Sequence, residues 1–381
     1  MPRKTVDRSI LQGEHIELFR AAIRSQSTRD PYERRLIRFL KWIDLTPDHF
    51  ISMSKKDPSF SEKKIISFIC MQVSRAQRGE ITSGTISNFL KAIRLLLEMN
   101  DISLNWKKIR RVLPRARRYA LDRIPTVEEI QEIIEAADLR GKALTLVPAT
   151  SGVREGAIES FKVDDYTHIE REGKVVAGRL VVYSGDPEKY VTFITPETCY
   201  ALDRYLNFRR EHREKVTGNS PLVRDKFDPI KGQYGHGKKD SIEVVVPMTA
   251  ASIRQYYNRL LFSIGIRNQR KRRHDFSVHG FRKFFKTKAE IGGMKPINVE
   301  TLMGHSTGVS DSYYRPTENE LLEDYLKVVE YFTIKSESRL KTEVEEIKGR
   351  DHVHADAIAT LSDQVMQLTV ELNKLKNGQQ K

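Results

Sequence analysis

The chain has 381 residues, enough for two or three domains with sizeable hydrophobic cores. It carries 66 lysines and arginines against 51 aspartates and glutamates, a net charge of +15 that favours nucleic acid over a membrane surface as the partner. No apolar run approaches the roughly 18–20 residues of a membrane-spanning helix, and the polar N-terminus lacks the apolar segment of a signal peptide. Cys70 and Cys199 each lie in an apolar stretch, which predicts two buried free thiols in a reducing compartment.

Residues 1–106 show apolar side chains at spacings of three and four, which is typical of amphipathic helices. The stripes are Tyr32, Leu36, Phe39, Leu40 and Ile43, then Ile65, Ile66, Phe68, Ile69 and Val73, then Ile86, Phe89, Leu90, Ile93, Leu96 and Leu97. Thr82 and Ser83 are both candidate N-caps of the third helix. No strand-like alternation interrupts the stripes, so these residues are predicted to form a small all-helical domain.

The composition becomes strongly basic between residues 107 and 125. The basic residues are Lys107, Lys108, Arg110, Arg111, Arg115, Arg117, Arg118 and Arg123, against the single acid Asp122. Pro114 and Pro125 break helices within and after this run. A solvated linker would have this composition, but a linker this basic between two domains of a basic protein favours contact with a phosphate backbone.

A second domain is predicted to begin near Thr126, which forms a capping box with Glu129. A helix carrying Ala143, Leu144, Leu146 and Val147 then leads to the Ser151–Gly152 turn. Residues 179–183 and 189–194 are predicted to be strands around a turn at 184–188, which indicates a small antiparallel sheet. Helices are expected at 196–215, 249–264 and 277–291, with a long loop or hairpin insertion at 216–247.

Two further helical segments are predicted near the C-terminus. Thr317 and Glu320 form another capping box, and the helix after it places Leu322, Tyr325, Val329 and Phe332 on one face. Residues 335–381 carry a heptad repeat with apolar residues at eight of ten seam positions, which predicts a coiled coil. The a positions are Val344, Asp351, Ile358, Val365 and Leu372, and the d positions are Ile347, His354, Leu361, Leu368 and Leu375. A single amphipathic helix folded back on the body is the alternative.

Three segments with residue types that are typical of active sites lie between residues 279 and 315. They are His279-Gly280-Phe281-Arg282, Met303-Gly304-His305-Ser306 and Ser312-Tyr313-Tyr314-Arg315. The H-x-x-R spacing places His279 and Arg282 on one helix face, one turn apart. Each segment is weak alone, but Thr150-Ser151-Gly152-Val153-Arg154 lies upstream of all three.

Together these segments resemble the tyrosine recombinases, the family of phage integrases and Xer-type recombinases. The separations of 26 residues from His279 to His305 and nine from His305 to Tyr314 are usual in that family. The resemblance covers about residues 126–333. It implies a mainly α fold with a small antiparallel sheet (α+β), made of a helical core-binding, DNA-binding domain at 1–106, a basic linker at 107–125, a catalytic domain at 126–334 and a C-terminal coiled coil at 335–381.

The resemblance also assigns roles that suit the chemistry. Transesterification at a phosphodiester adds negative charge to the non-bridging oxygens, and the guanidiniums of Arg154 and Arg282 can hold these oxygens with paired donors. Tyr314 is then the nucleophile, because the nine-residue spacing selects it over Tyr313, a packing aromatic. His279 is the base or a second phosphate ligand, and His305 is expected to donate a hydrogen bond to a phosphate oxygen.

The lysine that serves as the acid in this family is assigned to Lys189 in preference to Lys174, although the usual Gly-Lys-Gly turn is missing. Three residues after Arg154, where the family often has an acid, this chain has Ala157. Either Glu155 or Glu159 replaces that acid, or nothing does.

Other signals are weaker. Residues 232–239 approach a P-loop, but Lys239 stands where Mg²⁺ binding needs Ser or Thr, so no nucleotide is expected. Residues 351–356 carry Asp and His on several helix faces, so no metal is expected there. The cluster of Arg267, Arg270, Lys271, Arg272 and Arg273 is predicted to contact the DNA backbone.

The sequence therefore predicts a cytoplasmic, nucleoid-associated recombinase or integrase that binds double-stranded recombination sites and needs neither cofactor nor metal. The resemblance implies a 3′-phosphotyrosine intermediate and a tetramer that exchanges strands through a Holliday junction. We expect the helix at 317–332 to dock into a neighbouring protomer, and the coiled coil to strengthen the assembly. The alternatives are a type IB topoisomerase and a DNA-binding architectural protein without catalysis.

Overall fold

The computed structural model describes residues 7–115, 123–226, 242, 244–267, 277–306, 308 and 313–334. The chain divides into two compact units after residue 119. No helix among the described residues is long and apolar enough to cross a membrane. The predicted coiled coil at 335–381, the residues that approach a P-loop at 232–239 and the basic residues 270–273 lie outside the described part.

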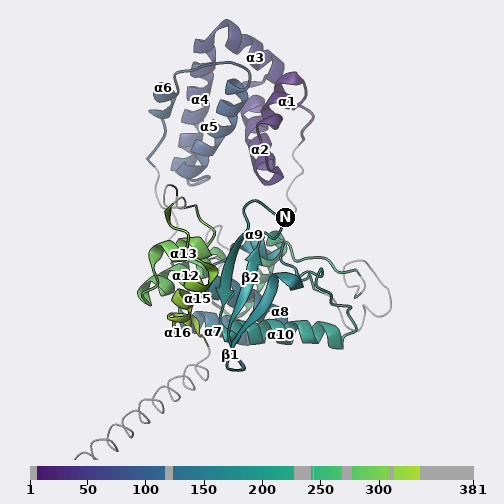
Figure 1. Cartoon of the computed structure of the whole chain (residues 1–381). Coiled ribbons are helices and arrows are strands. Elements are labelled where there is room, and N and C mark those ends of the chain that lie inside the picture. The colour runs from purple at the N-terminus through teal and green to yellow at the C-terminus, as the bar shows by residue number, and fades with distance from the viewer. Residues whose placement is uncertain are drawn as a thin grey trace, which may run out of the picture. The chain divides into compact units, whose positions relative to one another are not determined.

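The N-terminal unit is built from helices, as predicted (Figure 1). They are α1 (Glu14–Ala21), α2 (Gln26–Ile43), α3 (Pro47–Lys56), α4 (Pro58–Gln77), α5 (Ser83–Glu98) and α6 (Trp106–Arg110). The three apolar stripes lie on α2, α4 and α5. They meet in one core, where the Phe68 ring packs edge to face on Phe39 at 5.2 Å and on Phe89 at 5.4 Å between centroids. Thr82 is the N-cap of α5, since its hydroxyl accepts the N–H of Thr85.

The expectation of two buried thiols is correct for Cys199 and wrong for Cys70. Phe68 and Ile69 of α4 point into the helical core. Cys70 is the next residue, so the turn of the helix carries its side chain to the exposed face.

The second unit combines helices with one sheet. Its elements are α7 (Val127–Ala136), α8 (Leu139–Ser151), α9 (Glu155–Ile158), β1 (Tyr166–Arg171), β2 (Lys174–Val182), β3 (Tyr190–Ile194), α10 (Pro196–Glu211), α11 (Ala250–Ser263), α12 (His279–Ile291), α13 (Pro296–Leu302), α15 (Glu318–Leu326) and α16 (Val329–Phe332). The sheet is antiparallel with the order β1-β2-β3. The sequence predicted β2 and β3 but not β1, whose mostly exposed residues give little apolar alternation.

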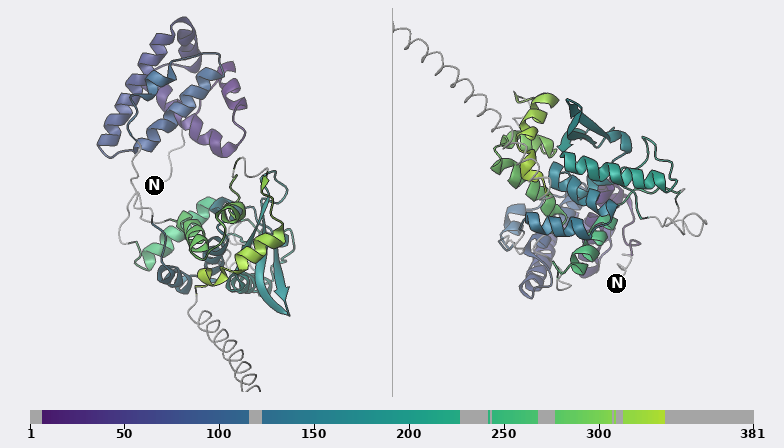
Figure 2. Two further views of the ribbon diagram at one scale, coloured as in Figure 1. Left: turned by 60° about the vertical axis from the view of Figure 1, so that its left-hand side comes forward. Right: turned by 90° about the horizontal axis from the view of Figure 1, so that it is seen from below.

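Side chains that alternate along β2 and β3 enter two different cores. Leu180 and Ile194 join the core formed with α8 and α10. Ala177 and Phe193 face the opposite way and join the core formed with α12, α13, α15 and α16. Figures 1 and 2 show these four helices gathered on one side of the sheet. The sheet therefore lies between two helical layers that share the strands.

In this single chain the helix expected at 317–332 packs on its own unit, and docking into a neighbouring protomer stays a prediction. Both predicted capping boxes are present, and Thr317 starts α15. The apolar face after it packs into the chain's own core, where Leu322, Tyr325 and Phe332 are buried. The Tyr325 hydroxyl donates to the carbonyl of Thr150 at 2.8 Å. In this conformation the chain's own core therefore covers the apolar face of α15.

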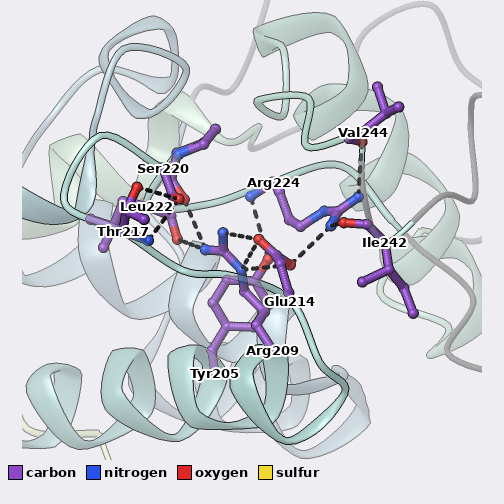
Figure 3. A network of polar contacts seen from close by, with 10 residues as sticks. Tyr205, Arg209, Glu214, Thr217, Ser220, Leu222, Arg224, Ile242 and Val244 are labelled. Atoms are coloured by element: carbon purple, nitrogen blue, oxygen red, sulfur yellow. Dashed lines mark hydrogen bonds and ion pairs between the residues drawn. The ribbon is translucent and has the colours of Figure 1, made fainter.

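A buried ion network fixes the chain after α10 (Figure 3). The carboxylate of Glu214 accepts from Arg209 Nε at 3.1 Å and from Arg224 NH1 at 2.9 Å. Arg209 also donates to the carbonyls of Pro221 and Leu222, and Arg224 donates to those of Ile242 and Val244. The network therefore joins both ends of the insertion predicted at 216–247, of which residues 227–241 and 243 lie outside the described part.

Candidate active site

Arg282 lies in the first turn of α12, and its side chain is 3% exposed. Its guanidinium donates to the carbonyl of Gly152 and, at 2.8 Å, to the carbonyl of Met303. A third N–H meets Nε2 of His305 at 2.6 Å. A guanidinium has five N–H donors, so these contacts leave two of them for an external acceptor.

Two glycines let the backbone approach Arg282 closely. Gly152 ends α8 at φ 67°, and a Cβ there would lie 2.4 Å from the ring of Phe285. Gly304 has φ 63°, and a Cβ there would lie 2.3 Å from the ring of Tyr190. Any larger residue would displace the Gly152 carbonyl that binds Arg282 or the turn that carries His305. The glycines of the Ser-Gly and Gly-His segments are therefore part of the construction of the site.

Arg154 and Tyr190 lie next to Arg282. Arg154 is half-buried at the start of α9, and its guanidinium forms no hydrogen bond or ion pair with the described residues. Burial, and then the charge of Arg154, lower the pKa of Arg282. The buried hydroxyl of Tyr190 has no hydrogen-bond partner among the described residues. Burial raises the pKa of Tyr190, and the charges of Arg282 and Arg154 oppose that rise. The result is a cluster of two guanidiniums, and no carboxylate of the described residues is bonded to either of them.

His305 connects this pocket to two charged residues that the sequence did not single out. Its Nδ1 hydrogen-bonds to the carboxylate of Glu300 on α13, and the same carboxylate pairs with Lys286 on α12. His279, the other predicted histidine, is exposed as the first residue of α12, three residues before Arg282. The structure thus brings His305 into direct contact with Arg282 and places His279 on the same helix end.

The two candidate lysines lie at opposite ends of the β2–β3 hairpin. Lys189 is exposed and directly precedes Tyr190, which faces the arginines. Lys174 begins β2 at the other end, paired with Arg171 of β1. Strand β2 spans nine residues, which at about 3.3 Å per residue is roughly 26 Å from one end to the other. Of the two lysines, Lys189 is thus the one at the hairpin end that carries Tyr190, and its role as the acid stays a prediction.

The hydroxyl of Tyr314 donates to the side-chain oxygen of Asn298 at 2.8 Å. The amide of the buried Asn298 in turn donates to Asp324 at 2.7 Å. Tyr314 lines a cavity of about 400 Å³, and it makes no hydrogen bond to the arginines or to His305. Tyr313 is 87% exposed, so its prediction as a packing aromatic is wrong, because the core beneath this segment is filled by α13 and α15.

The predicted DNA-contacting residues divide into three groups. Lys107, Arg110, Arg111 and Arg115 are exposed. Lys108 pairs with Glu62 at 2.7 Å, and Arg267 is buried and bonds to Asn258. Arg117, Arg118, Arg270, Lys271, Arg272 and Arg273 lie outside the described residues. The exposed group remains available for phosphate contacts.

Neither candidate replacement for the missing acid forms an ion pair with the guanidinium of Arg154. Glu155 pairs with Arg254, and Glu159 accepts the N–H of Ala250. The structure adds Tyr190, Glu300 and Asn298 to the site, and no spacing rule in the sequence singled these out. A weak signal existed for Glu300, since a carboxylate five residues before a histidine can reach it across a helix end. Among the described residues, no group of three or more His, Cys, Asp or Glu is placed to hold a metal.

Comparison with known proteins identifies the fold. No family model matches the chain, and no curated protein sequence matches it. The structure is similar to the Tn1549 transposon integrase in complex with transposon right end DNA, at 14% identity and a TM-score of 0.50, covering 81% of this chain and 96% of that one. It is also similar to XerA recombinase (20% identity, TM-score 0.37, 82% and 96% covered). A third similar structure is XerH site-specific recombinase in a post-cleavage complex with palindromic difH (16% identity, TM-score 0.47, 77% and 78% covered). The chain has the fold of the tyrosine recombinases.

Proposed function

We propose that this chain, which has the tyrosine-recombinase fold, is a site-specific recombinase that cuts and rejoins duplex DNA through a covalent tyrosine intermediate. The observation that carries the proposal is the pair formed by Arg154 and Arg282, two neighbouring guanidiniums with no bonded carboxylate among the described residues. Bringing two cations together without an anion is unfavourable. A phosphodiester between them would relieve the repulsion and would use their unpaired donors.

The proposed reaction is a transesterification at a DNA phosphodiester. The proton of the Tyr314 hydroxyl passes to His279, the Tyr314 oxygen attacks the scissile phosphorus, and the bond from phosphorus to the 5′ oxygen breaks. The products are a 3′-phosphotyrosine and a 5′-hydroxyl, whose proton comes from Lys189. Arg154 and Arg282 stabilise the charge that develops on the non-bridging oxygens. Attack by a 5′-hydroxyl from a partner strand reverses these steps, so the phosphodiester energy is conserved. A tetramer that exchanges strands through a Holliday junction completes the proposed cycle.

Tyr314 has to move before it reacts. Its hydroxyl is bonded to Asn298 and not to the groups of the arginine pocket. We place the release of this hydrogen bond on the reaction path, when DNA occupies the pocket.

Covalent trapping tests the proposal. The probe is a pool of nicked duplex oligonucleotides with a randomised core sequence, in which loss of the short strand beyond the nick prevents religation. The wild-type chain should form an adduct that survives denaturing detergent and forms in EDTA. Tyr314→Phe should form none, and Tyr313→Phe, the matched control one residue away, should react like wild type.

Each other outcome identifies a different protein. An adduct that survives in Tyr314→Phe and disappears in Tyr313→Phe assigns the nucleophile to Tyr313. Binding without an adduct from any duplex indicates an architectural DNA-binding protein. If the protein forms an adduct and relaxes supercoiled DNA but does not join strands of two duplexes, its activity is that of a topoisomerase.

A further inference from the structure

Glu300 lies between two partners. One carboxylate oxygen pairs with Lys286 Nζ, and the other hydrogen-bonds to Nδ1 of His305. The backbone adds a constraint, since the N–H of His305 donates to the carbonyl of Glu300 at 3.0 Å. On its other side, Nε2 of His305 meets the guanidinium of Arg282 at 2.6 Å. A continuous chain of polar contacts therefore runs from Lys286 through Glu300 and His305 to Arg282.

The chemistry of the end groups fixes the proton in the middle of this chain. A guanidinium can only donate, so the Nε2 that faces Arg282 carries no proton. An ionised carboxylate can only accept, so the Nδ1 that faces Glu300 carries one. Burial alone would raise the pKa of Glu300, but the hydrogen bonds from Lys286 and His305 outweigh it and lower that pKa. Both ends thus require a neutral imidazole with its proton on Nδ1.

We propose that Glu300 is a positioning residue, which holds His305 as the Nδ1–H tautomer so that Nε2 anchors the guanidinium of Arg282. His305 then acts on the phosphate through Arg282. This differs from the sequence-based expectation that His305 itself donates to a phosphate oxygen, because Nε2 has no proton to give in this arrangement. The consequence for the reaction rests on the proposed function, whereas the tautomer does not depend on it.

The arrangement explains why the carboxylate of Glu300 is separated from Arg282 by the ring of His305. A carboxylate bonded directly to Arg282 would occupy the donors that a phosphate needs. Glu300 instead fixes the orientation of Arg282 through a neutral ring, and Lys286 balances its charge. The guanidinium of Arg282 is thereby held on three sides, by the Gly152 carbonyl, the Met303 carbonyl and His305.

Nitrogen NMR of the free protein tests the tautomer without DNA. In the wild-type chain, the ring nitrogens of His305 should show a protonated Nδ1 and an unprotonated Nε2. In Glu300→Gln the amide can turn its NH₂ toward Nδ1, so the tautomers should mix or reverse. A wild-type spectrum with the proton on Nε2 would overturn the proposal, whether or not any variant folds.

The rate of adduct formation on a captured nicked duplex tests the consequence. Glu300→Gln should slow it between about tenfold and a hundredfold, since loss of orientation at a reacting group has effects of this size. Glu290→Gln is the matched control, because Glu290 also pairs with Lys286, at 3.6 Å, but does not bond to His305. It should keep the wild-type tautomer and rate.

The two measurements distinguish the tautomer of His305 from its effect on the reaction. If Glu300→Gln slows adduct formation but leaves the tautomer of His305 unchanged, Glu300 acts only on packing. If the tautomer changes but the rate of adduct formation does not, the tautomer does not affect the reaction. Either result overturns the proposal. If the wild-type chain forms no adduct with any duplex, the proposed function fails, and the NMR result still decides the tautomer.

Discussion

The second unit contains two pairs of arginines that differ in what lies between them. Arg209 and Arg224 are 0% and 2% exposed, and the carboxylate of Glu214 bridges them (Figure 3). Arg154 and Arg282 are neighbours too, but no carboxylate of the described residues bonds to either. The first pair is complete within the protein and therefore structural. The second lacks its anion, so we interpret it as a site for an external one.

The largest expected effect comes from removing the internal anion. Glu214→Gln should destabilise the second unit by about 3–5 kcal/mol, because it leaves two buried guanidiniums without their charge partner. Urea unfolding measures this. Glu211→Gln is the control, since that exposed carboxylate at the end of α10 should change stability by no more than about 0.5 kcal/mol. A loss below about 1 kcal/mol in Glu214→Gln would contradict the structural interpretation.

The opposite pattern is expected in the second pair. Arg154→Ala should slow adduct formation about 10²–10³-fold, the usual effect of removing one donor to a transition-state oxyanion. Stability should change by only about 0.5 kcal/mol, because Arg154 has no bonded partner among the described residues. Arg254→Ala is the control, an exposed arginine that pairs with Glu155. If Arg154→Ala unfolds the protein or reacts at the wild-type rate, the two pairs do not differ as we argue.

A substitution at Gly304, the residue before His305, should have a smaller effect on stability. Gly304→Ala places a methyl group 2.3 Å from the ring of Tyr190, and overpacking of this kind costs about 1–3 kcal/mol. Gly173→Ala is matched in backbone strain, with φ 73°, but has nothing within 4 Å of the added methyl group. Thermal unfolding of both variants separates the clash from the strain. Equal losses would show that Tyr190 does not press on the turn.

The smallest effect is a pH dependence of stability. Burial alone would raise the pKa of Glu214, but the hydrogen bonds from Arg209 and Arg224 lower it below its ordinary value of 4.5. The unfolded chain therefore takes up the proton first as the pH falls. The bridge contributes fully above pH 4.5, and the part of its contribution that comes from the lowered pKa is lost as the pH falls through the native pKa. The stability difference between wild type and Glu214→Gln, followed by urea unfolding, should shrink in that window. A constant difference would contradict the shift.

Much of the fold followed from local signals. The capping boxes at Thr126 and Thr317 and the stripes on α2, α4 and α5 depend on residues a few positions apart, so sequence spacing reveals them. Helix α13 was missed, because its seven residues are too few for a clear period. The strand β1 was missed because most of its side chains are exposed.

The site divides in the same way. The family pattern located Arg154, Arg282 and His305, which the structure gathers into one pocket. Tyr190, Glu300 and Asn298 depend on contacts that the sequence does not encode locally. Tyr190 meets Gly304 across more than a hundred residues, and Glu300 pairs with Lys286 of another helix. The docking of α15 depends equally on a distant partner, the carbonyl of Thr150.

The burial of α15 also limits the reach of Tyr314, the proposed nucleophile. Tyr314 lies four residues before Glu318, the first residue of a helix that Tyr325 ties to the body of the unit. Four residues of extended chain span at most about 14 Å. If Tyr314 is the nucleophile, as we propose, this short connection limits how far it can move from α15. If α15 were exchanged between protomers, the four-residue connection would carry Tyr314 to the neighbouring protomer. The position of α15 would then determine which DNA strand Tyr314 can reach.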